Sequence, residues 1–128
     1  MLTKSDKSKL RSTIFRHLDG IATSTSAYAL HKKEVLSYIL KHKTVDLNDL
    51  VKTFNANEGY LNIALRVLCS QGWLDQKIDN KTNQAQFSTN ANSASAFKLV
   101  HLYEAAVHLL KYSDQFAEEK TISTDAFI

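Results

Sequence analysis

The sequence predicts one mainly α-helical domain that carries a small β-hairpin. One observation is the shortage of helix breakers, because the 128 residues contain no proline and only three glycines. Another is a succession of apolar stripes at helical spacing along the first 72 residues. A third is the segment from Trp73 to Ser88, in which two short runs flank a polar turn. A chain of this length is sufficient for one modest core.

The first helix is expected over residues 4–20, with an apolar stripe of Leu10, Ile14, Leu18 and the following Ile21. Lysines and arginines lie mostly off this stripe, and Gly20 is expected to end the helix. Residues 21–27, IATSTSA, are expected to form a polar connector, so that 1–27 make a basic helix with its connector. This helix either docks by its narrow stripe or acts as a basic arm that contacts nucleic acid or an acidic partner.

Residues 28–91 are expected to form the core of the domain. ALHKKEVLSYILKHK has a core-facing stripe, and TVDLNDLVKTF predicts a helix that Asp46 caps. After a turn at residues 55–57, a further helix begins near Asn57 and ends at Gly72.

A two-stranded hairpin is expected next, with strands over 73–78 and 84–88 joined by DNKTN. The order of helix, short helix, helix and hairpin is that of a winged helix-turn-helix. The predicted fold is therefore a winged helix-turn-helix with a two-stranded wing, an N-terminal helix and a long C-terminal helix.

The C-terminal helix is expected over residues 92–113, and an acidic tail over 114–128. The helix is apolar on two faces, and a chain of this size has little with which to cover the second face. We expect this face to contact a second copy or a missing catalytic domain. The candidate partner face consists of Phe97, Val100, Tyr103, Val107 and Leu110.

The charge distribution bears on DNA binding, which requires positive charge beside the phosphates. Residues 1–43 contain nine basic and three acidic side chains, a net charge of +6, whereas residues 44–91 contain four basic and five acidic ones. The candidate DNA contacts of the helix and wing are Asn57, Tyr60, Asn62, Arg66, Lys77 and Lys81. A helix-turn-helix with so little positive charge favours packing over DNA reading, and nucleic acid remains the less favoured partner.

The stretch HKKEVLSYILKHKTVDLNDLVKTFNANEGYLNIALRVLCSQGWL, followed by a hairpin ending in FSTN, resembles the N-terminal winged-helix region of class I S-adenosylmethionine-dependent methyltransferases. It is most similar to the methyltransferase-like regions of bacterial polyketide synthases, over roughly residues 28–112. The matching positions are Asp46, Leu47, Leu50, Leu61, Ala64, Leu65, Arg66, Leu68, Gly72, Trp73 and Leu74. The resemblance implies a region that dimerises and helps to wall a substrate pocket.

The chain departs from that family in its chemistry. The three glycines are too scattered for the Gly-rich strand-to-helix turn that approaches the cofactor, so we expect no cofactor. His101 and His108 lie about 10 Å apart along one helix, too far for one metal ion. Cys69 is expected to be a small core residue and Trp73 a packing anchor at the base of the wing. No catalytic residue is predicted.

These observations favour a non-catalytic dimerisation or substrate-lid module of a methyltransferase-type, polyketide-like enzyme. The alternatives are a small homodimeric transcriptional regulator and an adaptor with a protein partner. The single cysteine and the absence of a secretory signal indicate the cytoplasm, and no apolar run approaches the roughly 18 residues of a membrane span.

Overall fold

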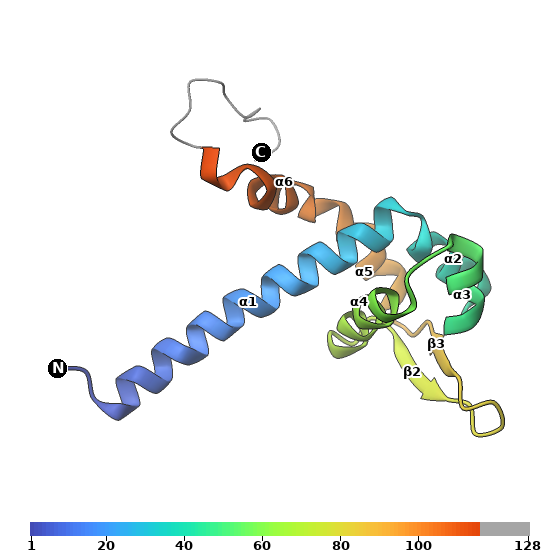
Figure 1. Cartoon of the computed structure of the whole chain (residues 1–128), viewed down its shortest axis with the longest axis horizontal. Helices are drawn as coiled ribbons and strands as arrows, with labels where there is room; N and C mark the ends of the chain where they lie inside the picture. Colours follow the sequence, from blue (N-terminus) through green and yellow to red (C-terminus); the bar gives the residue numbers. More distant parts are fainter. Residues whose placement is uncertain (116–128) are drawn as a thin grey trace.

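The computed structural model describes residues 1–115, and it confirms a mainly helical winged-helix fold (Figure 1). The expected tail at 114–128 lies almost entirely outside the described residues. The elements are α1 (Lys4–Lys32), α2 (Val35–His42), β1 (Thr44–Asp46), α3 (Leu47–Phe54), α4 (Glu58–Ser70), β2 (Asp75–Ile78), β3 (Ala85–Ser88), α5 (Ser93–Leu99), the 3₁₀ helix η1 (Val100–Tyr103), α6 (Glu104–Tyr112) and the 3₁₀ helix η2 (Ser113–Gln115).

Helix α1 is a single helix of 29 residues, about 43 Å long at 1.5 Å per residue. The expected end at Gly20 and the connector at 21–27 are therefore wrong. A capping box begins the helix, because the Thr3 side chain accepts a hydrogen bond from the Asp6 amide while the Asp6 carboxylate accepts one from the Thr3 amide. The break comes later, at Glu34, whose φ of 68° lies in the left-handed region.

The predicted connector is helical because its small polar side chains form hydrogen bonds with backbone carbonyls of the helix itself. The Ser24 and Thr25 hydroxyls both donate to the backbone carbonyl of Ile21. Thr23, Ser24 and Ala27 are buried, on the part of the chain where α1 packs against α4 and η1. Small side chains let the helices approach closely, so packing overrides the weak helix propensity of Ser and Thr.

The sheet has three strands in the order β1-β3-β2, and both pairings are antiparallel. The hairpin was predicted correctly in place, although β2 begins at Asp75 rather than Trp73. Strand β1 was not predicted, because its three residues immediately precede α3 and pair with β3 about forty residues later in the chain. Asp46 precedes α3 as expected, but its side chain makes no capping hydrogen bond.

The hydrophobic core lies between α1, the helix-turn-helix and the sheet. Asn55, in the left-handed conformation, ends α3, and the Asn57 side chain caps α4 by accepting from the Tyr60 amide at 3.1 Å. Leu65 and Phe87 are fully buried in this core. The helix-turn-helix is thus a packed unit that presents the outer side of α4.

The expected long C-terminal helix is interrupted, since η1 separates α5 from α6. None of the helices within residues 1–115 combines the length and apolar character that a membrane crossing requires.

Candidate interaction surfaces

Two surfaces could bind a partner: the outer side of α4 with the wing, and the uncovered sides of the terminal helices. On the first, the structure brings together only some of the six candidate DNA contacts. Asn57 is used as the cap of α4, and the Asn62 side-chain oxygen is buried without a hydrogen-bond partner among the described residues. Tyr60, Arg66, Lys77 and Lys81 are exposed.

The exposed side of α4 is mixed, because the polar side chains of Glu58, Arg66 and Ser70 are exposed on it beside Tyr60 and Ile63. Tyr60 and Ile63 are 77% and 60% exposed, one helical turn apart. A shallow groove of about 300 Å³ lies beside Ile63, where Arg66, Val67 and Ser70 complete its lining. An outward-facing isoleucine in this place offers no hydrogen bond to a base edge, so the surface suits a protein contact better than a base contact.

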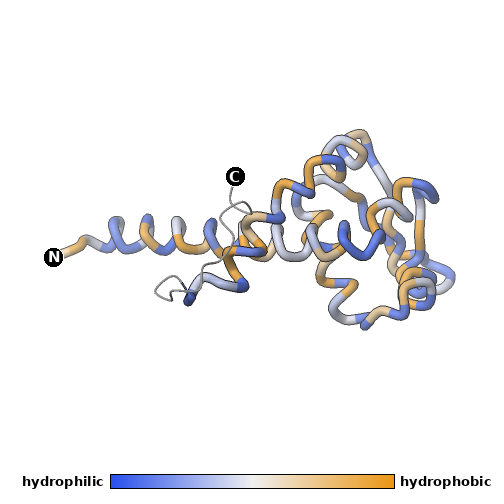
Figure 2. The backbone as a smooth tube through the Cα atoms, turned by 90° about the horizontal axis from the view of Figure 1, so that it is seen from above, coloured by the Kyte–Doolittle hydropathy of each residue, from blue (hydrophilic) through white to orange (hydrophobic). Residues whose placement is uncertain are grey.

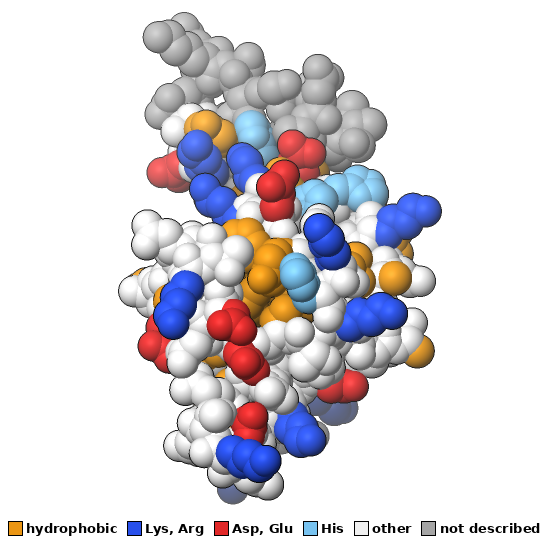
Figure 3. Space-filling view, turned by 90° about the vertical axis from the view of Figure 1, so that its right-hand side faces the viewer, with side chains coloured by type: hydrophobic (Ala, Val, Ile, Leu, Met, Phe, Trp, Pro, Cys, Tyr) orange, Lys and Arg blue, Asp and Glu red, His pale blue; other side chains and the backbone are white. Residues whose placement is uncertain are grey.

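The face that includes α2, α3 and the wing has mixed charge. Figure 3 shows lysines and arginines interspersed with acidic side chains, and hydrophobic side chains between them. A duplex bound across this face would meet repulsion as well as attraction, because phosphates are uniformly negative.

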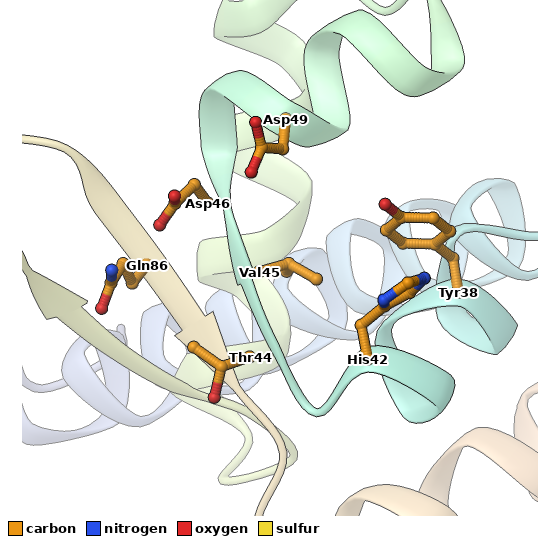
Figure 4. Close-up of a pocket in the computed structure, with 7 residues that line it drawn as sticks. All are labelled: Tyr38, His42, Thr44, Val45, Asp46, Asp49 and Gln86. Carbon is orange, nitrogen blue, oxygen red and sulfur yellow. The ribbon is translucent and has the colours of Figure 1, made fainter.

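A pocket of about 220 Å³ opens between α2, β1 and β3 (Figure 4). Its lining consists of Tyr38, His42, Thr44, Val45, Asp46, Asp49 and Gln86. The ring centroids of Tyr38 and His42 lie 4.1 Å apart, and the Tyr38 ring also contacts the Phe54 ring in an edge-to-face arrangement. In Figure 4 Asp46 and Gln86 lie on the opposite side of Val45 from these rings. The described part of the chain contains no group of three or more His, Cys, Asp or Glu residues placed to hold a metal ion.

Cys69 also lacks the surroundings of a nucleophile. Its thiol is half-buried beside the core, and burial is the main cause that raises its pKa above the ordinary 9.0, with the negative charge of Asp75 adding to the effect. A raised pKa disfavours the thiolate, which is the nucleophilic form of cysteine. Trp73 is also half-buried against the core, while its neighbour Leu74 is fully buried.

The N-terminal half of α1 carries more exposed large apolar side chains than any other helix of residues 1–115. This half extends away from the rest of the chain, and Figure 2 shows it projecting with hydrophobic and hydrophilic residues alternating along it. Leu10, Ile14 and Leu18 are 52%, 57% and 52% exposed, and Ile21 is also exposed. The sequence predicted this stripe, but none of residues 1–115 covers it.

The candidate partner face of the C-terminal region requires a correction. Phe97 and Val100 lie in the core, 4% and 1% exposed, where α5 contacts α2 and η1 contacts α1. Tyr103 and Val107 are half-buried, and Leu110 is exposed as expected. The large apolar side chains that face outward here are Leu99, Leu102, Leu109 and Leu110. The spacing of apolar residues in the sequence shows that the helix has two apolar faces. It does not show which of the two faces packs against the core.

Comparison with known proteins places the chain in a family. The family model for the AprA N-terminal domain matches residues 10–76, slightly more than half of the chain. The match begins within α1 and ends within β2, so it includes α1 from Leu10 onward and the helix-turn-helix but stops before β3. The resemblance expected over residues 28–112 is thus displaced toward the N-terminus. No curated protein matches the chain.

Several solved structures are similar. YusO from Bacillus subtilis is 13% identical, with 88% of this chain and 83% of that chain covered and a TM-score of 0.49. A MarR protein from Peptoclostridium difficile is 19% identical, with 99% and 88% covered and a TM-score of 0.48. The transcriptional regulator BldR from Sulfolobus solfataricus is 11% identical, with 92% and 91% covered and a TM-score of 0.47.

Proposed function

The chain belongs to the family of AprA N-terminal domains, and we propose that it is a non-catalytic module of a methyltransferase-type biosynthetic protein. In this proposal the module supports assembly or closes over a substrate, and the chemistry takes place on a catalytic domain. A polyketide-type pathway is the finer form of the proposal.

The observation that carries the proposal is family membership combined with a surface built for contact rather than reaction. Large aliphatic side chains are exposed on α1, α4 and η1, including Ile14, Ile63 and Leu102. The pocket between α2 and β1 is lined by Tyr38 and Val45 as well as by polar side chains, and burial raises the pKa of the Cys69 thiol above its ordinary value. Exposed apolar surface of this extent is typical of interaction sites.

The test is reconstitution with a catalytic domain. We expect isothermal titration of the purified chain with S-adenosylmethionine to give no heat of binding. We expect mass spectrometry of the native protein to find a methyltransferase-type catalytic domain, on the same polypeptide or in a one-to-one complex. The isolated catalytic domain should then bind the chain in titration and transfer methyl groups faster with it. Unchanged methyl transfer and no binding would overturn the proposal.

A homodimeric DNA-binding regulator is the second candidate, since Arg66, Lys77 and Lys81 are exposed around α4 and the wing. It is tested by fluorescence anisotropy of a labelled duplex of mixed sequence, titrated at low and moderate salt. Binding at micromolar protein that weakens steeply with salt would favour the regulator, because released counterions give that dependence. We expect no binding, because residues 44–91 contain four basic against five acidic side chains, and Ile63 on the exposed side of α4 offers no hydrogen bond to a base edge.

A further inference from the structure

The pocket between α2, β1 and β3 contains two carboxylates that the fold leaves free. Asp46 and Asp49 lie just before α3 and in its first turn, where an acidic side chain ordinarily accepts hydrogen bonds from the free amides of the helix. Neither side chain does so here, and no hydrogen bond or ion pair within residues 1–115 involves either carboxylate. Both side chains instead line the pocket.

The starts of α1 and α4 show the ordinary arrangement. Thr3 and Asp6 form a capping box on α1, and the Asn57 side chain caps α4. In both places the helix uses the polar side chain at its own start. At α3 the corresponding acidic side chains are free, and a cavity of about 220 Å³ lies beside them. The carboxylates of α3 are therefore available to a ligand.

The charge of this pocket selects for a positive ligand. Its described lining includes two carboxylates and no lysine or arginine, and the Thr44 hydroxyl and the Gln86 amide add further hydrogen-bond acceptors. Two carboxylates do not suffice for a metal ion, and residues 1–115 contain no group of three or more His, Cys, Asp or Glu residues that could hold one. An organic cation is the class of ligand that this lining fits.

The two sides of the pocket differ in chemistry. Figure 4 shows Asp46 and Asp49 on one side and the rings of Tyr38 and His42 on the other, with Val45 between them. The two rings pack against each other, with centroids 4.1 Å apart, and so do not form an open aromatic cage for a quaternary ammonium. A primary ammonium suits the carboxylates better, because it has three N–H donors.

The size of the pocket limits the ligand. A volume of about 220 Å³ is below the roughly 300–1,000 Å³ of most drug-sized ligand sites. Tyr38 also lines a neighbouring cavity of about 400 Å³, to which Lys41 of α2 and Phe54 of α3 contribute. A short aliphatic amine therefore matches the first pocket, and a longer stem has room beyond Tyr38.

We propose that this pocket binds the primary ammonium group of a small aliphatic amine, with Asp46 and Asp49 as its acceptors. The ammonium donates hydrogen bonds to the two carboxylates, and the aliphatic stem lies against Val45. The proposal goes beyond the module's proposed role and does not rest on it, because it requires neither a catalytic domain nor a second copy.

The experiment is a two-dimensional NMR titration of the ¹⁵N-labelled chain with n-butylamine, at fixed pH and ionic strength. Three further probes separate the contributions: n-butanol lacks the charge, choline lacks the N–H donors, and a lysine blocked at both backbone ends stands for the side chain of a partner protein. Asp46→Asn and Asp49→Asn each remove one charge and keep the shape of the side chain. Asp19→Asn is the matched control, since Asp19 is exposed on α1 and does not line the pocket. The spectra themselves show whether each variant keeps its fold.

We expect n-butylamine to shift the amide signals of residues 44–49 and of Gln86 until they saturate. n-Butanol and choline should bind at least about tenfold more weakly, since each lacks the charge-assisted hydrogen bonds. Asp46→Asn and Asp49→Asn should each weaken the binding of n-butylamine by about tenfold, because each removes one such hydrogen bond. Asp19→Asn should leave the binding unchanged.

Four results would overturn the proposal. The first is the absence of a saturable shift in the pocket residues. The second is an equal loss of binding in Asp19→Asn, which would mean that amines associate with any exposed carboxylate. The third is choline or n-butanol binding as tightly as n-butylamine. The fourth is tighter binding of the blocked lysine, which would assign the pocket to a partner's side chain rather than to a free amine. None of these results touches the proposed function, which fails instead on the methyl-transfer measurement.

Discussion

The two halves of helix α1 differ in a way that reverses the usual relation between side chain and environment. In residues 22–32 the buried positions are Thr23, Ser24, Ala27 and Leu30, three of them small. In residues 4–21 no residue is buried, although Leu10, Ile14 and Leu18 are far more apolar. One continuous helix therefore packs by small side chains at one end and presents large ones to solvent at the other. The fold buries the packing side of residues 22–32, whereas the apolar side chains of residues 4–21 are left exposed for a partner.

The largest expected effect tests whether apolar residues in the two regions stabilise different states. Phe87→Ala should lower the free energy of unfolding by about 3–5 kcal/mol, because Phe87 is fully buried and its removal leaves a cavity. Leu18→Ala should leave the unfolding of the monomer almost unchanged and act only through assembly. Urea unfolding at several protein concentrations separates the two, since only the effect of Leu18→Ala should grow with concentration. If Phe87→Ala and Leu18→Ala lowered the free energy of unfolding equally at low protein concentration, the proposed difference between core and exposed stripe would be wrong.

Overpacking the small-residue end should have the next largest effect. Ala27 is fully buried where α1 packs on its neighbours, so Ala27→Leu should destabilise the chain by about 1–3 kcal/mol. Ala29 lies two residues further along and is exposed, and Ala29→Leu is the matched control with an expected change near zero. Thermal unfolding measures both. Equal stability of the two variants would mean that the close approach of α1 is not required.

Sequence reasoning found the helix-turn-helix because its apolar faces are complete and its ends carry Asn57 and Gly72. It failed where distant contacts decide. IATSTSA reads as a connector locally, and only its burial against α4 and η1 makes it helix. Strand β1 exists because β3 pairs with it from far along the chain.

The candidate surface was predicted only in part for the same reason. The periodicity of residues 93–112 shows that apolar positions are in excess, but the contacts of α5 with α2 and of η1 with α1 decide that Phe97 and Val100 are buried while Leu102 is exposed. The stripe on α1 was identified by its spacing. Whether other parts of the chain cover this stripe depends on the tertiary structure, and the spacing of apolar residues in the sequence does not reveal it.

A glycine at the junction of the two halves gives a smaller effect of known sign. Gly20 lies within α1, and a Cβ added there would meet nothing within 4 Å. Gly20→Ala should therefore stabilise the helix by about 0.5–1 kcal/mol. The matched control is Gly72→Ala, which should destabilise by about 1–2 kcal/mol because Gly72 has a φ of 79°. Hydrogen exchange should show slower opening of the N-terminal half in Gly20→Ala alone. Faster exchange there would mean that the junction acts as a hinge.

The capping box should give the smallest effect and the only one that depends on pH. Hydrogen bonds from Thr3, the side chain first and the backbone second, lower the pKa of Asp6 below its ordinary 3.8. A lowered folded-state pKa means that the cap stabilises α1 at pH above 3.8 and loses that contribution as the pH falls through the lowered value. Thr3→Ala should raise the pKa of Asp6 toward 3.8, whereas Thr3→Ser, which keeps the hydroxyl, should leave it low. A carboxyl-carbon NMR titration follows Asp6 directly. If the pKa were the same in Thr3→Ala and Thr3→Ser, the cap would not be formed in solution, and the projecting half of α1 would lack a fixed start as well as a covering surface.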